Sequence, residues 1–419
     1  MKKYWLFILC FSFALKLFPQ DSIQSITKYN MDSLFQAMQV EAIQRATEER
    51  ATILKKLATA PSDSICKLRI ESLYFEELPD ISRFKYIIAI DAEKNLFKSV
   101  KKSAFSSDSL KSANFSSNNL KKIHFPKNSP IKTLVLNFNN FKRIPRSIRK
   151  LQQLEYLEIS NNQIRRIPRF LKKNKKLTLL DLNYNQVRFT KKSVKNLSNI
   201  NTLLLGSNGL VYVPENIGDL QKLRKLNLGK NNLSSLPPSF KELDSMTNLI
   251  FYQNDFTEIP PEIFYLKNLV ELDFYYNKIT IIPPGIGGLS KLKQLFLSFN
   301  QIKVLPDTLQ NLQNLKYFFI HHNELSIMPN WIGKMVSIER MGISYNHIVS
   351  MPNLSEMAAL SELDVQDNLL GNFPWELLDK PNMKLLIVKN NNFILTKEEE
   401  KMLRDWKNEA GQEGLVVIF

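Results

Sequence analysis

An asparagine recurs every 23 residues through most of this 419-residue chain. It occupies ten equally spaced positions: 139, 162, 185, 208, 231, 254, 277, 300, 323 and 346. Around it lies the pattern L-x-x-L-x-L-x-x-N-x-L-x-x-L-P-x-x-I-x-x-L-x-x, which residues 223–243 and 292–312 match closely. A fixed period of this length is the signature of stacked structural repeats. We therefore expect one continuous stack, although the length alone suggests about two or three domains.

The repeat contains two groups of apolar positions. Positions one, four and six alternate like a short strand with one buried face, and positions eleven, fourteen, eighteen and twenty-one complete a core. One repeat cannot bury this surface alone, so neighbouring repeats must share it. The amide of the position-nine asparagine can satisfy backbone groups of adjacent turns, and the proline at position fifteen fixes the backbone of the opposite segment. These residues predict a fold and say little about function.

The pattern resembles that of the leucine-rich repeat family, in the 23-residue bacterial or Ras-group-like class with its L-P-x-x-I segment. The resemblance covers about four-fifths of the chain. It implies an α/β solenoid, a horseshoe whose parallel sheet lines the concave side, which is the usual binding surface of the family. Position nine is Asn in fourteen of fifteen copies, and Leu73 is the exception. The copies start at Ile65, Ile87, Leu110, Ile131, Leu154, Leu177, Ile200, Leu223, Met246, Leu269, Leu292, Leu315, Ile338, Leu360 and Met383.

The first 64 residues predict a signal and a cap. Residues 1–20 combine a positive start with a short apolar run, which is the shape of a secretory signal. We expect cleavage near Asp21, and an uncleaved membrane anchor is the alternative. Residues 21–64 are expected to form a helical N-terminal cap, because the end of such a stack would otherwise expose its core. Its helix is expected from Met31 to Ala58, with Asp32 or Ser33 as the N-cap.

The repeats are expected to fill residues 65–395, and residues 396–419 are expected to form the C-terminal cap. Thr396 and Glu399 have capping-box spacing, which predicts a helix that ends at about Glu409. Residues 415–419 are apolar and are expected to pack against this cap. A C-terminal recognition tail is the alternative.

Copies nine to thirteen carry an unusual density of aromatic residues at outward-facing strand positions. Strands lie about 4.8 Å apart, so five strands make a patch about 20 Å wide. Aromatic residues at this density favour a protein-binding surface, to which Glu271, Glu339 and Arg340 add polar contacts. Tyr276 and its equivalents at position eight, Phe299 and Tyr345, are instead expected to pack along the edge of the stack. The predicted concave patch consists of Ile250, Tyr252, Asp273, Tyr275, Phe296, Tyr317, Phe319 and His321.

The net charge of +17 is concentrated in one segment. Residues 98–195 hold 24 Lys and Arg but only four acidic residues, so this segment carries +20. A column of like charges is mildly unfavourable unless an anion lies nearby. Surface polysaccharide, lipid phosphate or an acidic protein would supply one, and a solvated flank that keeps the protein soluble is the alternative. The predicted anion-binding flank consists of Lys98, Lys121, Lys122, Lys142, Arg143, Arg165, Arg166 and Arg188.

Motifs for catalysis, metals or nucleic acid are missing from the sequence. The pair His321–His322 lacks metalloprotease spacing, and adjacent strand residues are expected to diverge. No phosphate-binding loop or nucleophile elbow occurs, and two cysteines exclude a disulfide scaffold. No nucleic-acid motif accompanies the cations, and nucleic acid is not expected behind a secretion signal. We therefore expect no catalytic residues, metal site or cofactor.

Together these features predict a non-enzymatic scaffold that binds a protein on its concave patch. The signal predicts a secreted or cell-envelope location, in the periplasm or at the cell surface, and the basic flank would hold the protein near anionic envelope material. We expect a monomer. The alternative is an intracellular or membrane-anchored signalling scaffold, and an enzyme is the third class, which only His321 and His322 keep open. The sequence names no partner.

Overall fold

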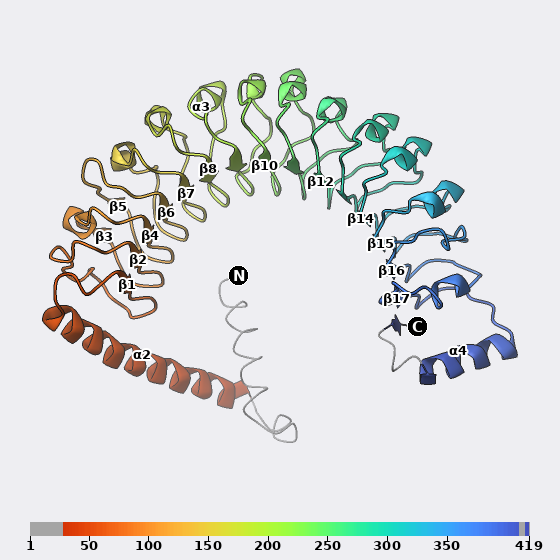
Figure 1. The fold of residues 1–419 in the computed structure, drawn as a ribbon, viewed down its shortest axis with the longest axis horizontal. Helices are drawn as coiled ribbons and strands as arrows, with labels where there is room; N and C mark the ends of the chain where they lie inside the picture. The colour runs from red at the N-terminus through yellow and green to blue at the C-terminus, as the bar shows by residue number, and fades with distance from the viewer. Residues whose placement is uncertain (1–27, 410–414, 419) are drawn as a thin grey trace.

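Sixteen short parallel strands form one sheet along the inner side of a horseshoe (Figure 1). The computed structural model describes residues 28–409 and 415–418. The sheet follows the order of the chain, and neighbouring strands pair at equivalent repeat positions. This architecture confirms the predicted solenoid. The predicted signal, residues 1–20, lies outside the described residues.

Fifteen of these strands stand at positions three to five of the fifteen repeats. The central residue of each strand is buried and the two outer residues mostly remain accessible, which is the alternation that the sequence pattern predicts. A sixteenth strand, β18, follows the last repeat, and β3 and β5 form a separate two-stranded sheet. The strands are β1 Lys67–Arg69, β2 Ala89–Asp91, β3 Ser99–Val100, β4 Ser112–Asn114, β5 Lys122–Ile123, β6 Thr133–Val135, β7 Tyr156–Glu158, β8 Leu179–Asp181, β9 Thr202–Leu204, β10 Lys225–Asn227, β11 Asn248–Ile250, β12 Glu271–Asp273, β13 Gln294–Phe296, β14 Tyr317–Phe319, β15 Arg340–Gly342, β16 Glu362–Asp364, β17 Leu385–Ile387 and β18 Val416–Ile418.

The outer side of the horseshoe carries a short helical turn in most repeats (Figure 1). Eight of the described 3-10 helices have the position-fifteen proline as their N-cap. Proline suits the start of a helix because its fixed φ fits there and it brings no amide donor that would need a partner. The outer helices are η2 Lys102–Phe105, η3 Arg146–Lys150, η4 Arg169–Lys173, α3 Lys191–Val194, η5 Ile217–Asp219, η6 Pro238–Glu242, η7 Pro261–Tyr265, η8 Pro284–Gly288, η9 Asp307–Asn311, η10 Asn330–Lys334 and η11 Trp375–Leu377.

Apolar side chains fill the space between the sheet and the outer helices. Leu269 and Leu272, at positions one and four, are fully buried. Phenylalanine replaces the smaller core residues in several repeats: the Phe251 ring lies 5.1 Å from that of Phe274 and 5.3 Å from that of Phe256. One continuous core therefore connects neighbouring repeats, as stacked repeats require.

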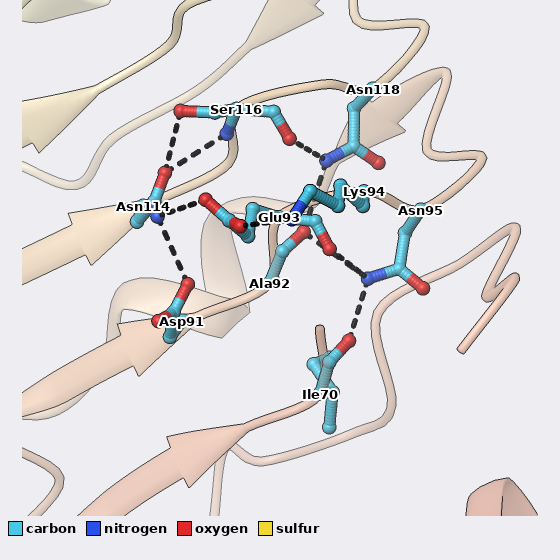
Figure 2. A network of polar contacts seen from close by, with 9 residues as sticks. All are labelled: Ile70, Asp91, Ala92, Glu93, Lys94, Asn95, Asn114, Ser116 and Asn118. Atoms are coloured by element: carbon cyan, nitrogen blue, oxygen red, sulfur yellow. Dashed lines mark hydrogen bonds and ion pairs between the residues drawn. The ribbon is translucent and has the colours of Figure 1, made fainter. Parts of the chain in front are cut away.

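The position-nine asparagines connect neighbouring repeats through hydrogen bonds, as Figure 2 shows for Asn95 and Asn118. The side-chain amide of Asn95 donates to the carbonyl of Ile70 in the preceding repeat at 2.6 Å, and that of Asn118 donates to the carbonyl of Ala92 at 3.0 Å. The side-chain oxygen of Asn118 accepts from the backbone N–H of Phe97 at 3.1 Å. The structural role predicted for this asparagine is therefore confirmed.

The helix α2, Lys28–Thr59, covers the N-terminal end of the stack with only part of its length (Figure 1). The helix extends beyond the predicted start, Met31, and the predicted end, Ala58. The predicted N-cap was wrong, because Asp32 and Ser33 lie inside a helix that already includes Lys28. Only part of the helix's apolar residues is buried. Of its residues, Ala46, Leu57 and, partly, Ile53 are buried, whereas Phe35, Met38, Ile43 and Leu54 are exposed.

The C-terminal end is closed by the helix α4, Lys397–Glu409, and by β18. The backbone N–H of Thr396 donates to the Glu399 carboxylate at 2.8 Å, and the N–H of Glu399 donates to Thr396 Oγ1 at 3.2 Å, so the expected capping box is present. Leu415 and Val417 are partly buried against the hydrophobic core, to which Leu403 of α4 also belongs. Residues 416–418 in addition extend the sheet beside β17, which the sequence did not predict, because the backbone groups at a sheet edge need hydrogen-bond partners.

Candidate protein-binding surface

The predicted concave patch lies on the strands β11 to β14 and on the residues that follow them. All eight of its residues are half-buried, so each keeps part of its surface open to the concave side. Strand pairing sets Asp273 beside Phe296, Phe296 beside Phe319, and Phe319 beside Gly342. The fold therefore gathers on one surface residues that are up to 71 positions apart in the chain.

The position-eight residues of four consecutive repeats form a stacked column of rings, which we call the aromatic ladder: Tyr276, Phe299, His322 and Tyr345. The distances between consecutive ring centroids are 4.1, 4.0 and 4.1 Å, and the interplanar angles do not exceed 24°. All four residues have positive φ, between 52° and 55°. Packing along the edge, as predicted for position eight, is confirmed for this column. The rings stack on one another and keep part of their surface exposed.

Two position-seven residues join the aromatic ladder edge-on. The Tyr275 ring lies 4.7 Å from Tyr276 and 5.2 Å from Phe299, and the His321 ring lies 5.3 Å from Phe299. Edge-to-face and stacked contacts at these distances stabilise an aromatic cluster beyond the burial of its area. The predicted patch and the position-eight column are therefore one surface in this region.

The side chains of His321 and His322 do not diverge as the sequence analysis expected. Their Nδ1 atoms lie 2.9 Å apart, because the positive φ of His322 interrupts the alternation of an extended strand. Burial lowers the pKa of both imidazoles below its usual value and so favours their neutral forms. In the described part of the chain, no group of three His, Cys, Asp or Glu residues is placed to hold a metal ion.

Phe296 and Phe319 form a second, separate stack at the ends of the strands β13 and β14. Their ring centroids lie 5.7 Å apart and the rings are nearly parallel, at 5°. Gly342 continues this row in the next strand, and a Cβ atom there would come within 2.8 Å of Phe319 Cδ1. The glycine therefore makes room for the Phe319 ring.

Tyr252 stands apart from both stacks. No ring contact in the described residues joins it to the aromatic ladder or to Phe296. Its ring instead covers Gly229, where a Cβ atom would overlap the ring at 2.2 Å, and Lys230 Nζ lies 5.8 Å from its centroid. Burial, together with the neighbouring Tyr184, raises the pKa of Tyr252 to about 12, so its hydroxyl stays protonated at neutral pH. Tyr252 thus forms a separate aromatic contact point on the same face.

Charged groups lie between and beside these rings. Burial and the nearby Glu271 raise the pKa of Asp273 to about 6, although its Oδ1 accepts a hydrogen bond from the Tyr275 N–H at 2.8 Å. At the other side, Lys316 Nζ lies 2.5 Å from the Glu339 carboxylate and holds the Glu339 pKa below its usual value. Beside this pair, the Arg340 guanidinium lies 5.7 Å from the Tyr317 ring centroid. Carboxylates therefore flank the rings on the concave face.

The predicted anion-binding flank lies on the segments that lead from the inner sheet to the outer side. All eight of its cationic residues are exposed, and none forms an ion pair with a carboxylate in the described residues. Two adjacent grooves open on this flank. The first has a volume of about 760 Å³ and is lined by Lys142, Arg143, Arg146, Arg165 and Arg166. The second, of about 390 Å³, shares Lys142, Arg143 and Arg146 and adds Lys121, Lys122 and His124.

Comparison with known proteins settles the family. A leucine-rich repeat family model matches residues 129–187 and 244–302, and a second leucine-rich repeat model matches residues 222–243. The chain is a leucine-rich repeat protein. No curated protein matches its sequence.

Solved structures of other leucine-rich repeat proteins share its fold. A leucine-rich repeat protein of Leptospira interrogans is 26% identical, with a TM-score of 0.74, over 87% of this chain and 98% of that one. An internalin of Listeria monocytogenes is 19% identical, with a TM-score of 0.59, over 87% and 92%. The plant peptide hormone receptor RGFR1, solved in complex with RGF2, is 27% identical, with a TM-score of 0.59, over 78% of this chain and 56% of the receptor.

The structure of this leucine-rich repeat protein also shows an apolar stripe that the sequence analysis missed. Ile281, Val304 and Ile327 stand at position thirteen of three consecutive repeats and are 65%, 71% and 65% exposed. Arg143 and Arg166 hold the same position in earlier repeats. The flank therefore changes from cationic to apolar along the stack. The sequence does contain a signal for this stripe, because its three residues share position thirteen. Comparison of position thirteen across all copies would have predicted the stripe.

No helix in the described part of the chain combines the length and the apolar character that crossing a membrane requires.

Proposed function

We propose that this leucine-rich repeat protein is a non-enzymatic scaffold that binds a protein partner on its concave face. One observation carries the proposal: three groups of aromatic residues, on the strands β11 to β14 and on the residues that follow β11 to β15, keep part of their surface open on one concave face, with carboxylates beside them. Interfaces favour such surfaces, because rigid aromatic rings bury much area and lose little conformational entropy on binding. The similar plant peptide hormone receptor RGFR1 was solved in complex with RGF2, which supports a binding role for this fold.

The contact points of the proposed interface differ in kind. The aromatic ladder with Tyr275 and His321 offers ring edges and faces, Phe296 and Phe319 offer a flat apolar surface, and Tyr252 offers a phenol that remains protonated. Asp273 and Glu271 add negative charge between them. These features favour a partner segment with apolar anchors and a basic group.

A pull-down with the full chain tests this function. Proteins captured by the wild type are compared with those captured by Tyr252→Ala/Tyr275→Ala/Phe319→Ala, which removes one ring from each of the three groups. We expect the specific partner to be lost from the variant, because the central aromatic residues of an interface contribute most of its binding energy. Circular dichroism checks that the variant is folded. Equal recovery by a folded variant would reject the concave patch as the binding site.

We further propose that the protein acts outside the cytoplasm, secreted or in the cell envelope. The positive start and apolar run of residues 1–20 support export. In this setting the basic flank would keep the protein close to anionic envelope material while the concave face holds the protein partner. An intracellular or membrane-anchored signalling scaffold is the alternative.

A further inference from the structure

The two basic grooves form one recessed channel across three repeats. They share the wall formed by Lys142, Arg143 and Arg146. The strand β5 belongs to the third repeat, and Lys122 in it lines the outer end of the second groove. Arg165 and Arg166 of the fifth repeat line the far end of the first groove. The channel thus runs along the stack, from one repeat to the next.

The charges of this channel have few partners in the protein. No carboxylate lines either groove, and Arg165 has a neutral partner, Gln186, whose Oε1 lies 3.1 Å from its Nε. The ion pairs of the surrounding basic segment involve other residues, Lys101 with Glu77 and Lys132 with Glu155. Cations that gather without counter-charges repel one another, and a bound anion removes this repulsion.

The floor of the first groove is apolar, unlike its rim. Ile144 and Ile167 are buried, and the half-buried Pro168 and Phe170 complete the lining. A cationic rim around an apolar floor suits a ligand that has both a ring with apolar faces and a negative group. A free phosphate needs only the cations, and a flat layer of lipid head groups does not reach a recessed floor.

We propose that this channel binds an acidic glycan, a chain of sugar rings that carry sulfate, phosphate or carboxylate groups. The sugar rings lie against Pro168 and Phe170, and the negative groups pair with Arg143, Arg146, Arg165 and Arg166. Arginine suits this role because its planar guanidinium makes two parallel hydrogen bonds to such groups. Lys142 and Arg165 hold position twelve of consecutive repeats and Arg143 and Arg166 hold position thirteen, so a chain with repeated negative groups can meet cations of successive repeats along the channel. This inference rests on the proposed role of the basic flank and narrows it to one ligand class.

The test measures binding of the full chain to heparin, with neutral dextran as the control glycan. The groove variant is Arg143→Gln/Arg146→Gln/Arg165→Gln/Arg166→Gln. Its matched control is Lys173→Gln/Lys175→Gln/Lys191→Gln/Lys192→Gln, which removes the same charge from exposed lysines that line neither groove. We expect wild type and control to bind heparin with affinity that falls as salt rises, and the groove variant to bind at least about tenfold more weakly.

A second variant, Phe170→Leu, tests the apolar floor. It keeps an apolar side chain but removes the ring, and we expect weaker binding to heparin with an unchanged dependence on salt. If the groove variant and the lysine control lost heparin affinity equally, binding would depend on the overall positive charge and not on the channel. This result would overturn the proposal. So would an unchanged affinity of Phe170→Leu, or tight binding to phosphatidylglycerol vesicles or inorganic phosphate without binding to heparin.

A measurement on the unmodified protein covers the case in which the groove variant does not fold. Heparin should protect Lys121, Lys122 and Lys142 from acetylation in the wild type, whereas Lys173 and Lys191 should stay reactive. If Lys121, Lys122 and Lys142 reacted equally with and without heparin, the proposal that the channel binds the glycan would be overturned. The concave variant Tyr252→Ala/Tyr275→Ala/Phe319→Ala should keep full heparin binding, so a failure of the protein-binding proposal is distinguishable from a failure of this one.

Discussion

At the scale of single residues, the repeat depends on polar groups that are buried and fully paired. Asn254 is 7% exposed, and its amide donates to the carbonyls of Leu228 and Phe251 at 3.0 and 2.9 Å. Its Oδ1 accepts from the backbone N–H of Leu233 at 3.0 Å. Such a side chain connects two repeats, and no apolar residue can replace it without leaving a backbone group unpaired.

We predict that Asn254→Ala lowers the free energy of unfolding by about 1–3 kcal/mol, because the buried N–H of Leu233 loses its partner. Chemical denaturation measures the stability, and hydrogen exchange at the Leu233 amide, which should become faster, locates the effect. The exposed Thr257→Ala in the same repeat is the control and should change stability little. Slow exchange at Leu233 in a folded variant would contradict this role of the asparagine.

Asp273 has the opposite energetic character, because burial makes its charge unfavourable. Its pKa rises from the ordinary 3.8 to about 6, so the folded state favours the protonated form. Its contribution to stability is present below about pH 4 and is lost as the pH rises through 6. We predict that Asp273→Asn, which can keep the hydrogen bond to the Tyr275 N–H, is more stable than wild type at pH 7.5 by up to about 3 kcal/mol.

Denaturation of both proteins at several pH values checks this prediction. The advantage of Asp273→Asn should shrink toward pH 4, where the wild-type carboxyl is protonated. Glu258→Gln, which removes an exposed carboxylate from the flank, should show no comparable gain. A constant difference between wild type and Asp273→Asn from pH 4 to 7.5 would show that the charge of Asp273 is not the cause.

At the scale of elements, the regular parts of the repeat were predictable from the sequence and the irregular parts were not. The strands follow from alternation around position four, and the outer turns follow from the proline at fifteen. The positive φ at position eight was not predictable from the residue types. Glycine or asparagine would be expected at such a φ, but position eight holds Tyr276, Phe299 and His322. Its conformation comes from contacts between repeats: the N–H of Tyr276 donates to the carbonyl of Ser298 at 3.0 Å.

The two ends of the stack depart from prediction for a related reason. Local sequence patterns predicted the helices α2 and α4 and the capping box at Thr396. They did not show that α2 leaves Phe35 and Met38 exposed, or that residues 416–418 join the sheet, because both depend on what the neighbouring repeat offers. The concave patch was predictable as a set of residues because register alone places them. The separation into the aromatic ladder, the Phe296 pair and Tyr252 depends on side-chain packing.

At the scale of the whole molecule, the horseshoe separates two proposed binding surfaces. The early repeats carry the basic segment of residues 98–195, with its net charge of +20, and the aromatic surface lies several repeats later, on β11 to β15 (Figure 1). This arrangement allows the protein to contact an acidic glycan and a protein partner at once. Each surface can then be removed by mutation without the other.

Export is the prediction that belongs to the whole chain. We expect fractionation of the producing cells to find a mature protein that starts near Asp21 outside the cytoplasm. The apolar run of residues 1–20 supplies the physical reason, because it is long enough for a secretion signal and short for a membrane span. N-terminal sequencing identifies the cleavage site. A full-length chain confined to the cytoplasm would instead support an intracellular scaffold.

The most direct test of the central claim is the recovery of the captured partner in quantitative pull-downs with two matched triple variants. The concave variant is Tyr252→Ala/Tyr275→Ala/Phe319→Ala, and the control, Tyr86→Ala/Tyr212→Ala/Tyr265→Ala, removes three exposed rings elsewhere. We predict that the control retains the partner and that the concave variant binds it at least about 30-fold more weakly, since a single central aromatic residue contributes about 2 kcal/mol or more. Equal binding of the partner by wild type and a folded concave variant would contradict the claim that this leucine-rich repeat protein binds through its concave aromatic surface.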